Sequence, residues 1–386
     1  AWQRLKAEEL LAQQLSQHQA RRERAAQRAP VLSPLDAPDS LHARLLAALP
    51  FALTGAQARV GLEIERDLAR ELPMHRLLQG DVGSGKTVVA ALAAARCIDA
   101  GYQCALMAPT EILAAQHFGK LVGWLDPLLA ERGLRVAWLT GSQKKRERDQ
   151  MSAAVGNGEA ALVIGTHAVI SEKVRFKSLA LAIIDEQHRF GVAQRLALRG
   201  KAADGPAETG SRSGPTATGP TPGGLEPHLL MMSATPIPRT LAMSYYADLD
   251  VSTLDELPPG RTPIVTRLVA EHRRDEVVGR IQAQLAQGRQ VYWVCPLIEE
   301  SEAVDLRNAT ETRDELAETL GASVRVGLLH SRMPTGEKQA VMAEFVAGRL
   351  QVLVSTTVIE VGVDVPNASL MVIEHAERFG LSQLHQ

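Results

Sequence analysis

The chain has 386 residues, of which 45% are hydrophobic, a composition that is ordinary for a protein with packed cores. Its 42 basic and 44 acidic residues give a formal net charge of −2, so any contact with nucleic acid must come from local groups. No apolar run approaches the ~18 residues of a membrane span, and Cys97, Cys104 and Cys295 form no C-x-x-C pair. We therefore expect a cytoplasmic protein with reduced thiols and no zinc site, disulfide framework or membrane segment.

The N-terminal segment predicts one helix over residues 1–29. Its first half carries an apolar stripe at helical spacing, and its second half is basic. The basic half is either a solvated face or a contact for a DNA backbone. Pro30, Pro34 and Pro38 should end the helix, so we interpret residues 1–38 as a basic linker helix. The stripe consists of Trp2, Leu5, Leu11 and Leu15, and the basic residues are Arg21, Arg22, Arg24 and Arg28.

Two further helices are predicted, over residues 39–49 and 56–71, and Thr54 is a suitable N-cap for the second. Phe51 and Gln57 flank this start. An aromatic ring can stack on adenine, and a side-chain amide can pair with N6 and N7 of the base. The same two residues also fit a capped helix with Phe51 in the core, and both interpretations stay open.

The stretch from Gly80 to Thr87 matches G-x-x-x-x-G-K-[ST], the phosphate-binding loop. A strand-like run, residues 76–79, precedes it, and a helical run, residues 88–98, follows. The glycines let several backbone N–H groups converge on one anion, and the helix N-terminus adds its positive dipole end. Lys86 should reach the β- and γ-phosphates of ATP, and the Thr87 hydroxyl should hold Mg²⁺. Gly80, Gly83, Ser84 and Gly85 complete the predicted loop.

Apolar runs then alternate with helical segments, at residues 104–108, 136–139, 161–164, 179–184 and 229–232. Continuous apolar strands between helices predict a parallel sheet covered on both faces. Polar residues follow each strand, and the carboxyl edge of such a sheet is where ligands bind. These residues are Thr110, Thr140 to Ser142, Thr166 with His167, Asp185 with Glu186, and Ser233 to Thr235.

Asp185 and Glu186 follow an apolar strand about a hundred residues after Lys86. In phosphoryl-transfer sites an aspartate at this place holds Mg²⁺ together with the loop threonine, and the next carboxylate can deprotonate the attacking water. Lys86, Asp185 and Glu186 are thus the predicted catalytic residues, and Thr87 and Asp185 the predicted metal ligands. A small P-loop phosphotransferase and an ATP-gated DNA-binding scaffold remain alternatives.

The domain plan has four parts: the linker helix, a first domain over residues 39–250, a linker over 251–263, and a second α/β domain over 264–386. Residues 201–228 hold six glycines and five prolines, and we expect a disordered insertion there. The second domain should contain strands at 264–269, 290–295, 324–329, 352–355 and 370–374, with helices near 273–287, 313–320 and 335–346.

The phosphate loop, the D-E-x-H of residues 185–188, the S-A-T of 233–235 and the stretch 356–366 together resemble the motifs of superfamily 2 helicases. The resemblance implies two RecA-like domains in tandem. It also implies an ATP-dependent DNA translocase. The stretches 257–261 and 291–300 resemble translocases that remodel stalled forks and Holliday junctions more than they resemble other members of the superfamily. The motor of transcription-repair coupling factors is the nearest alternative.

The resemblance assigns further roles residue by residue. Hydroxyls and backbone N–H groups are suited to contacts with DNA phosphates, which do not depend on the base sequence. Branched DNA, ATP and a single-strand-binding protein are the implied partners of a monomeric, nucleoid-associated protein. The added ATP residues are His188, Gly362 and Asp364. Ser233 and Thr235 belong to a coupling turn, which the resemblance implies links the nucleotide state to domain movement. The added DNA residues are Thr110, Gln116, Thr140, Gly141, Ser142, Thr166, His167, His330, Arg332 and Thr357.

Two parts of the family pattern are expected outside the sequence. A DNA-splitting wedge domain should precede Ala1, and a sixth motif that starts at Gln386 should continue with arginines. Arginine fingers contribute ~10³–10⁵ in rate in related NTPases. We therefore expect this chain by itself to bind Mg-ATP but to hydrolyse it poorly.

Overall fold

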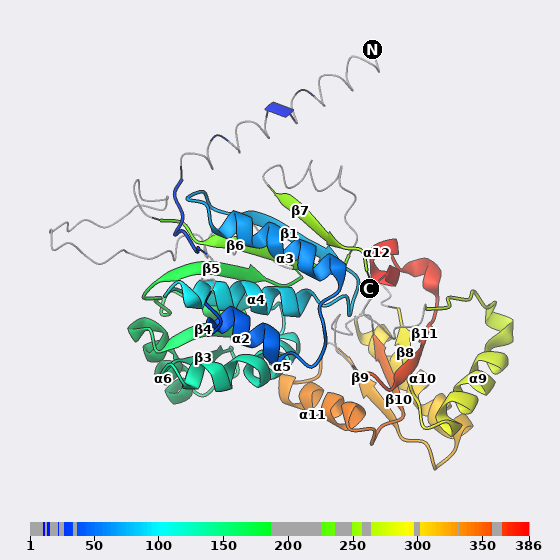
Figure 1. Ribbon diagram of the computed structural model, residues 1–386. Helices are drawn as coiled ribbons and strands as arrows, with labels where there is room; N and C mark the ends of the chain where they lie inside the picture. The colour runs from blue at the N-terminus through cyan, green and yellow to red at the C-terminus, as the bar shows by residue number, and fades with distance from the viewer. Residues whose placement is uncertain are drawn as a thin grey trace. The chain divides into compact units, whose positions relative to one another are not determined.

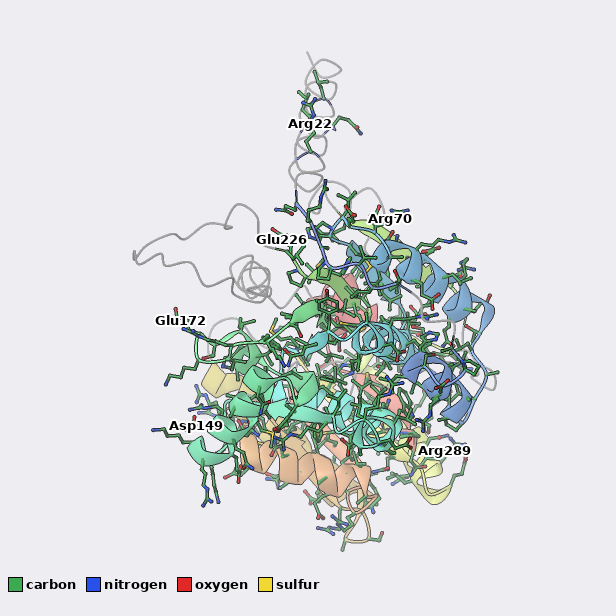
Figure 2. The ribbon with its side chains drawn as sticks, turned by 60° about the vertical axis from the view of Figure 1, so that its left-hand side comes forward. Arg22, Arg70, Asp149, Glu172, Glu226 and Arg289 are labelled. Atoms are coloured by element: carbon green, nitrogen blue, oxygen red, sulfur yellow. The ribbon has the colours of Figure 1, made fainter. Side chains whose placement is uncertain are left out.

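The computed structural model describes residues 11, 14–15, 22, 27–33, 37–186, 225–235, 249–256, 264–296, 302–330, 332–356 and 365–385. The chain divides into two compact units, residues 1–261 and 262–386 (Figure 1). Charged side chains such as Asp149 and Glu172 project outward from the first unit (Figure 2). No helix among the described residues is long and apolar enough to span a bilayer.

The first unit contains a seven-stranded sheet in which all pairs are parallel, in the order β3-β4-β2-β5-β6-β1-β7. Strands β2, β4, β5 and β6 are buried along their whole length, as expected for a parallel sheet with both faces covered. The predicted fold class is confirmed here. The strands are β1 (His75–Gly80), β2 (Gln103–Met107), β3 (Arg135–Leu139), β4 (Ala160–Gly165), β5 (Leu179–Ile184), β6 (His228–Ser233) and β7 (Asp250–Leu254).

Helices cover both faces of this sheet. Its helices are α2 (Leu41–Ala48), α3 (Gly55–Leu68), α4 (Lys86–Asp99), α5 (Glu111–Ala130) and α6 (Lys145–Asn157), with a 3-10 turn η1 (His167–Ile170). Leu106 and Ile164 belong to the core shared with α4 and α5, whereas their neighbours Ala105 and Val163 belong to a core shared with α6. This alternation is the period of two that a strand imposes on its side chains.

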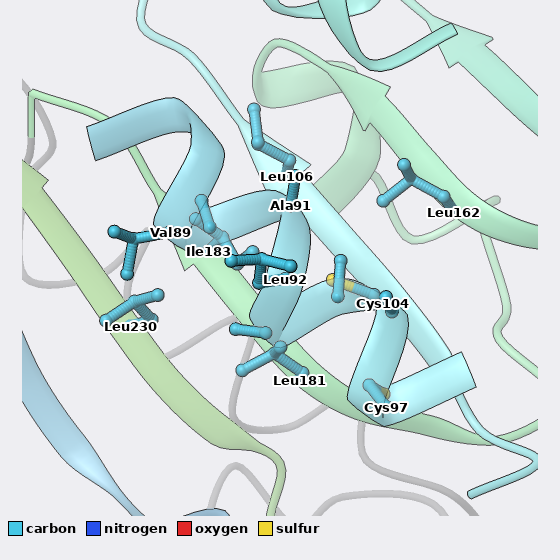
Figure 3. Close-up of a cluster of buried hydrophobic side chains, with 14 of the residues drawn as sticks. Val89, Ala91, Leu92, Cys97, Cys104, Leu106, Leu162, Leu181, Ile183 and Leu230 are labelled. Atoms are coloured by element: carbon cyan, nitrogen blue, oxygen red, sulfur yellow. The ribbon is translucent and has the colours of Figure 1, made fainter. Parts of the chain in front are cut away.

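Helix α4 is buried at every position from Val88 to Ile98. It packs against strands on one side and against α2 and α3 on the other, so no face of it needs polar residues. Figure 3 shows Val89, Leu92 and Cys97 among strand side chains such as Leu181 and Leu230. Burying one leucine stabilises the fold by ~1.5–3 kcal/mol, so the helix that follows the phosphate loop is held firmly in place.

The N-terminal prediction needs correction at its end. Residues 27–33 are not helical: Arg28 pairs with Leu225 in a β-bridge, and Leu32 is buried with its N–H bonded to Leu68 O at 2.9 Å. The apolar Leu32 gains more by packing on the first unit than a solvated linker would allow. Most of residues 1–26, where the rest of this helix was predicted, lies outside the described residues.

The end of the expected insertion is ordered as well. His228 is the first residue of β6 and is fully buried, with Nδ1 accepting from Met74 N at 3.0 Å and Nε2 donating to Pro30 O at 2.7 Å. We name residues 27–33 the N-terminal strap, because His228 joins them to the start of β1. The prediction that disorder extends to residue 228 is therefore wrong for 225–228, and residues 201–224 lie outside the described part.

The expected linker over residues 251–263 is also corrected. Residues 250–254 form β7, an edge strand that pairs in parallel with β1, with Arg76 opposite Asp250. Its burial alternates at Ser252 and Leu254, a weaker signal than the continuous apolar runs of the central strands. Pairing with β1 outweighs the polar composition of this stretch.

The second unit has a four-stranded parallel sheet in the order β11-β8-β10-β9, built on the buried Trp293. This confirms a second parallel α/β domain. The predicted strand at 264–269 is wrong, because residues 264–270 have no strand partner among the described residues and Leu268 is 93% exposed. The elements are β8 (Gln290–Cys295), β9 (Val326–Leu329), β10 (Val352–Thr356), β11 (Ala368–Ile373), η3 (Glu271–Arg273), α9 (Arg274–Ala286), α10 (Glu302–Leu320), α11 (Thr335–Val346), η4 (Ala376–Arg378) and α12 (Leu381–His385).

Candidate nucleotide and nucleic-acid site

The predicted phosphate loop joins the end of β1 to the start of α4, as the strand–loop–helix pattern requires. Gly83 and Gly85 have φ angles of 79° and 91°, in the left-handed region that favours glycine. A Cβ at Gly85 would also collide with the amide of Gln57, and one at Gly80 would lie 2.6 Å from Ser84 Oγ. The loop is therefore a tight cradle in which side chains at these glycines would obstruct the backbone.

Lys86 folds back over this loop. Its Nζ donates to Gly80 O at 2.7 Å and to Asp81 O at 3.1 Å. The Ser84 hydroxyl is buried and has no hydrogen-bond partner among the described residues. A positive ammonium, an unused buried hydroxyl and a helix N-terminus all suit an anion, so the residues fit the phosphates of a nucleotide.

Gln57 braces the loop from the side. Thr54 and Gln57 form a reciprocal capping box at the start of α3, which confirms the predicted N-cap. Gln57 Nε2 also donates to Ser84 O at 2.9 Å, and the side chain is buried. Its adenine contact stays a prediction, and the contact with the phosphate loop is one that the sequence alone did not reveal.

Phe51 is not a core residue, because its side chain is 45% exposed. Its ring meets that of Trp124 on α5 edge-on, with 6.4 Å between the centroids. An exposed aromatic face near the start of α3 remains compatible with stacking on a base. Trp124 is an aromatic neighbour that the sequence did not single out.

Asp185 lies just after β5, and its carboxylate meets a histidine on α5. His117 Nε2 is 2.6 Å from Asp185 Oδ2, and both side chains are buried. Burial favours the protonated acid, but the charge and hydrogen bond of His117, the charge of Lys86 and the Glu186 backbone outweigh it, so the pKa of Asp185 is lowered. An ionised carboxylate together with the Thr87 hydroxyl provides hard oxygen ligands of the kind Mg²⁺ prefers, so the residues fit that ion.

Glu186 has a φ of 47°, a strained value for a residue with a side chain. Its Oε1 accepts from Ala234 N at 3.3 Å, and Ser233 Oγ lies 2.7 Å from Thr235 Oγ1. The structure thus brings the predicted base and the predicted coupling turn into direct contact. Among the predicted nucleotide residues, His188, Gly362 and Asp364 lie outside the described residues.

The predicted DNA residues of the first unit gather at the ends of β2, β3 and β4, which are neighbours in the sheet. Thr110 caps α5, while Gly141, Ser142 and His167 are exposed. Thr140 and Thr166 are only 1% and 2% exposed, so their hydroxyls do not reach the surface. Gln116 is half-buried on α5.

Glu111, which the sequence did not single out, closes this cluster. Its carboxylate accepts from Ser142 N at 2.9 Å and from Ser142 Oγ at 2.6 Å. A carboxylate bound to one N–H and one hydroxyl shows that the turn can hold an anion.

In the second unit, His330 follows β9 and Arg332 is exposed two residues on. Burial, followed by the charges of Lys338 and Arg332, lowers the pKa of His330. Thr357, the remaining predicted DNA contact, lies outside the described residues.

Comparison with known proteins defines the class first. Residues 62–244 match the family model "DEAD/DEAH box helicase", and residues 274–386 match "Helicase conserved C-terminal domain". The yeast protein Dbp5, in a structure with RNA and ADP BeF3, shares the fold at TM-score 0.60 and 17% identity over 87% of this chain and 78% of its own. The chain thus contains the two tandem RecA-like domains of the superfamily 2 helicases.

More narrowly, the chain is similar along its whole length to proteins named ATP-dependent DNA helicase RecG. The RecG of Escherichia coli K12 is 54% identical over all of this chain and 52% of its own length, and that of Synechocystis is 50% identical over 88% of this chain and 38% of its own. A solved structure of RecG bound to a three-way DNA junction matches with TM-score 0.76 and 41% identity, covering 100% of this chain and 46% of that one. The chain spans about half the length of the curated relatives it matches.

Proposed function

We propose that this chain is the motor region of a DNA translocase that couples Mg-ATP hydrolysis to the remodelling of branched DNA, including stalled forks and Holliday junctions. One observation carries the nucleotide half of this proposal. The phosphate loop, the Asp185–Glu186 pair and the Ser233–Thr235 turn follow β1, β5 and β6, and the sheet order places these strands next to one another. A nucleotide on the loop therefore lies beside the carboxylates and the coupling turn.

Each residue has a defined task in this proposal. Thr87 and Asp185 would hold Mg²⁺, which would supply neutralisation of phosphate charge when it is bound with the nucleotide. Lys86 exchanges its carbonyl contacts for phosphate oxygens. Glu186 takes a proton from the attacking water. Its hydrogen bond from Ala234 N connects it to the coupling turn, so a change at Glu186 alters the contacts of that turn.

The DNA half rests on the neighbouring strand ends. The exposed Gly141, Ser142 and His167 carry N–H and hydroxyl donors, which suit phosphate contacts that do not read sequence, and those of Ser142 are held by Glu111. The relative solved with a three-way DNA junction supports a branched substrate for this chain as well. We extend this proposal to a single-strand-binding protein as partner and to action as a monomer.

The test is ATP binding and turnover, with and without forked DNA, in the wild type and in Lys86→Ala. We expect DNA to stimulate turnover and Lys86→Ala to lose nucleotide binding by at least tenfold. The binding measurement is informative even if this chain by itself hydrolyses ATP as poorly as expected, because it does not depend on turnover. Nucleotide binding that is unchanged in Lys86→Ala would contradict the site, and turnover that DNA does not raise would contradict the translocase.

A further inference from the structure

His117 is a buried histidine that the proposed chemistry does not use, although it touches the carboxylate that should hold the metal. Its Nε2 lies 2.6 Å from Asp185 Oδ2, and the side chains are 11% and 9% exposed. Because the carboxylate is ionised, the imidazole N–H donates this bond. The bond fixes the Oδ2 side of Asp185 and thereby sets how the carboxylate can meet a cation.

Helix α5, which carries His117, also contacts the proposed DNA edge, by which we mean the ends of β2, β3 and β4 with the exposed Gly141, Ser142 and His167. Glu111, in the first turn of α5, holds the backbone N–H and the hydroxyl of Ser142, and Thr110 caps the helix. Glu111 and His117 are six residues apart, about 9 Å along the helix axis at 1.5 Å per residue. A packed helix moves as one body, so a displacement at Glu111 is felt at His117.

We propose that His117 is a positioning residue for Asp185, and that α5 thereby couples occupation of the DNA edge to the metal-binding carboxylate. This inference rests on the proposed function. DNA phosphate at the turn competes with the Glu111 carboxylate for Ser142, the first turn of α5 shifts, and His117 reorients Asp185. A histidine with only a structural role would contribute stability and leave this coupling intact.

Equilibrium binding tests the proposal without relying on turnover. The dissociation constant of a fluorescent forked DNA is measured with and without saturating Mg-AMP-PNP, and that of AMP-PNP is measured with and without Mg²⁺. Linkage requires that DNA and nucleotide change each other's affinity by the same factor, typically 5–150-fold for coupled sites. In the wild type we expect a factor of at least fivefold.

In His117→Ala, nucleotide should change the dissociation constant of the DNA by less than twofold. The factor by which Mg²⁺ tightens AMP-PNP binding should be at least fivefold smaller than in the wild type. His117→Gln, which keeps an N–H at a similar reach, should recover most of both. Leu121→Ala is the matched control, since Leu121 is a buried residue one turn further along α5 in the hydrophobic core. It should lower stability while keeping the wild-type factors.

Circular dichroism checks that each variant is folded. If His117→Ala does not fold, His117→Met takes its place, because methionine fills the space but cannot donate a hydrogen bond to Asp185. Wild-type coupling in His117→Ala overturns the proposal, as does an equal loss in Leu121→Ala. A wild type that binds Mg-nucleotide and DNA without coupling overturns the link through α5 and leaves the proposed function standing. Failure to bind either ligand contradicts the proposed function itself.

Discussion

Glu186, the proposed catalytic base, has a strained backbone. Its φ of 47° costs about 1–2 kcal/mol in a residue with a Cβ, and the flanking β5 residues, buried in the sheet, hold it there. Strain of this kind persists where the surrounding structure overdetermines the backbone. It aims the carboxylate at Ala234 N instead of letting it relax into solvent.

The proposed role of Glu186 as general base predicts that turnover and nucleotide affinity respond differently to its substitution. Glu186→Gln should lower turnover by about 10²–10⁴-fold, the range a general base contributes, while the nucleotide dissociation constant changes less than threefold. Turnover assays together with nucleotide titrations measure the two quantities separately. A turnover rate within threefold of the wild type would remove Glu186 from this role.

Gly85 is a glycine that the phosphate loop requires for both its backbone angle and its lack of a side chain. Gly85→Ala should destabilise the protein by at least ~1–2 kcal/mol, because φ is 91° and the new Cβ meets the Gln57 amide, and nucleotide binding should fall with it. Gly61→Ala is the control, since Gly61 lies inside α3 with open space around it, and it should stabilise by ~0.5–1 kcal/mol. Chemical denaturation measures both, and equal effects of the two variants would contradict this account.

The N-terminal strap depends on a neutral histidine. His228 is fully buried, and burial, which outweighs the opposing contact with Pro30 O, lowers its pKa below the ordinary value of 6.5. Its Nδ1 accepts from Met74 N, so a proton at this nitrogen would replace a hydrogen bond with repulsion. The strap is thus joined to β1 by a group that tolerates only one protonation state.

This predicts a pH dependence with a defined sign. A histidine with a depressed folded-state pKa contributes its full stability above pH 6.5 and loses it as pH falls below that value, by at most about 1.4 kcal/mol per pH unit for one proton. His42, whose pKa is also lowered by burial, adds a slope of the same sign. Denaturation between pH 7.5 and 5 should give a shallower slope for His228→Gln than for the wild type, and equal slopes would contradict the assignment.

At the scale of the whole molecule, a net charge of −2 means that DNA affinity must arise from a local site. Since the proposed contacts are to phosphates, the affinity for forked DNA should fall at least tenfold between 50 and 200 mM salt, with the same slope for unrelated sequences. Fluorescence anisotropy over a salt series measures this. A preference above tenfold for one sequence, or an affinity independent of salt, would contradict backbone recognition.

The sequence by itself determined the elements whose physics is local. The phosphate loop needs glycines and a lysine at fixed spacing, and the structure places it between β1 and α4 as predicted. The continuous apolar runs predicted the parallel sheets, because strands buried on both faces have no polar positions. Thr54 was recognisable as an N-cap from its position before α3, and the capping box confirms it.

Only the tertiary structure decided which distant residues meet. His117 and Asp185 are 68 residues apart, Gln57 and Ser84 are 27 apart, and His228 and Pro30 are 198 apart. None of these pairs has a local pattern, because strand order and helix packing, not spacing along the chain, bring their elements together. For the same reason β7 and the N-terminal strap were missed: their weak apolar signals become stabilising once β1 and α3 are in place beside them.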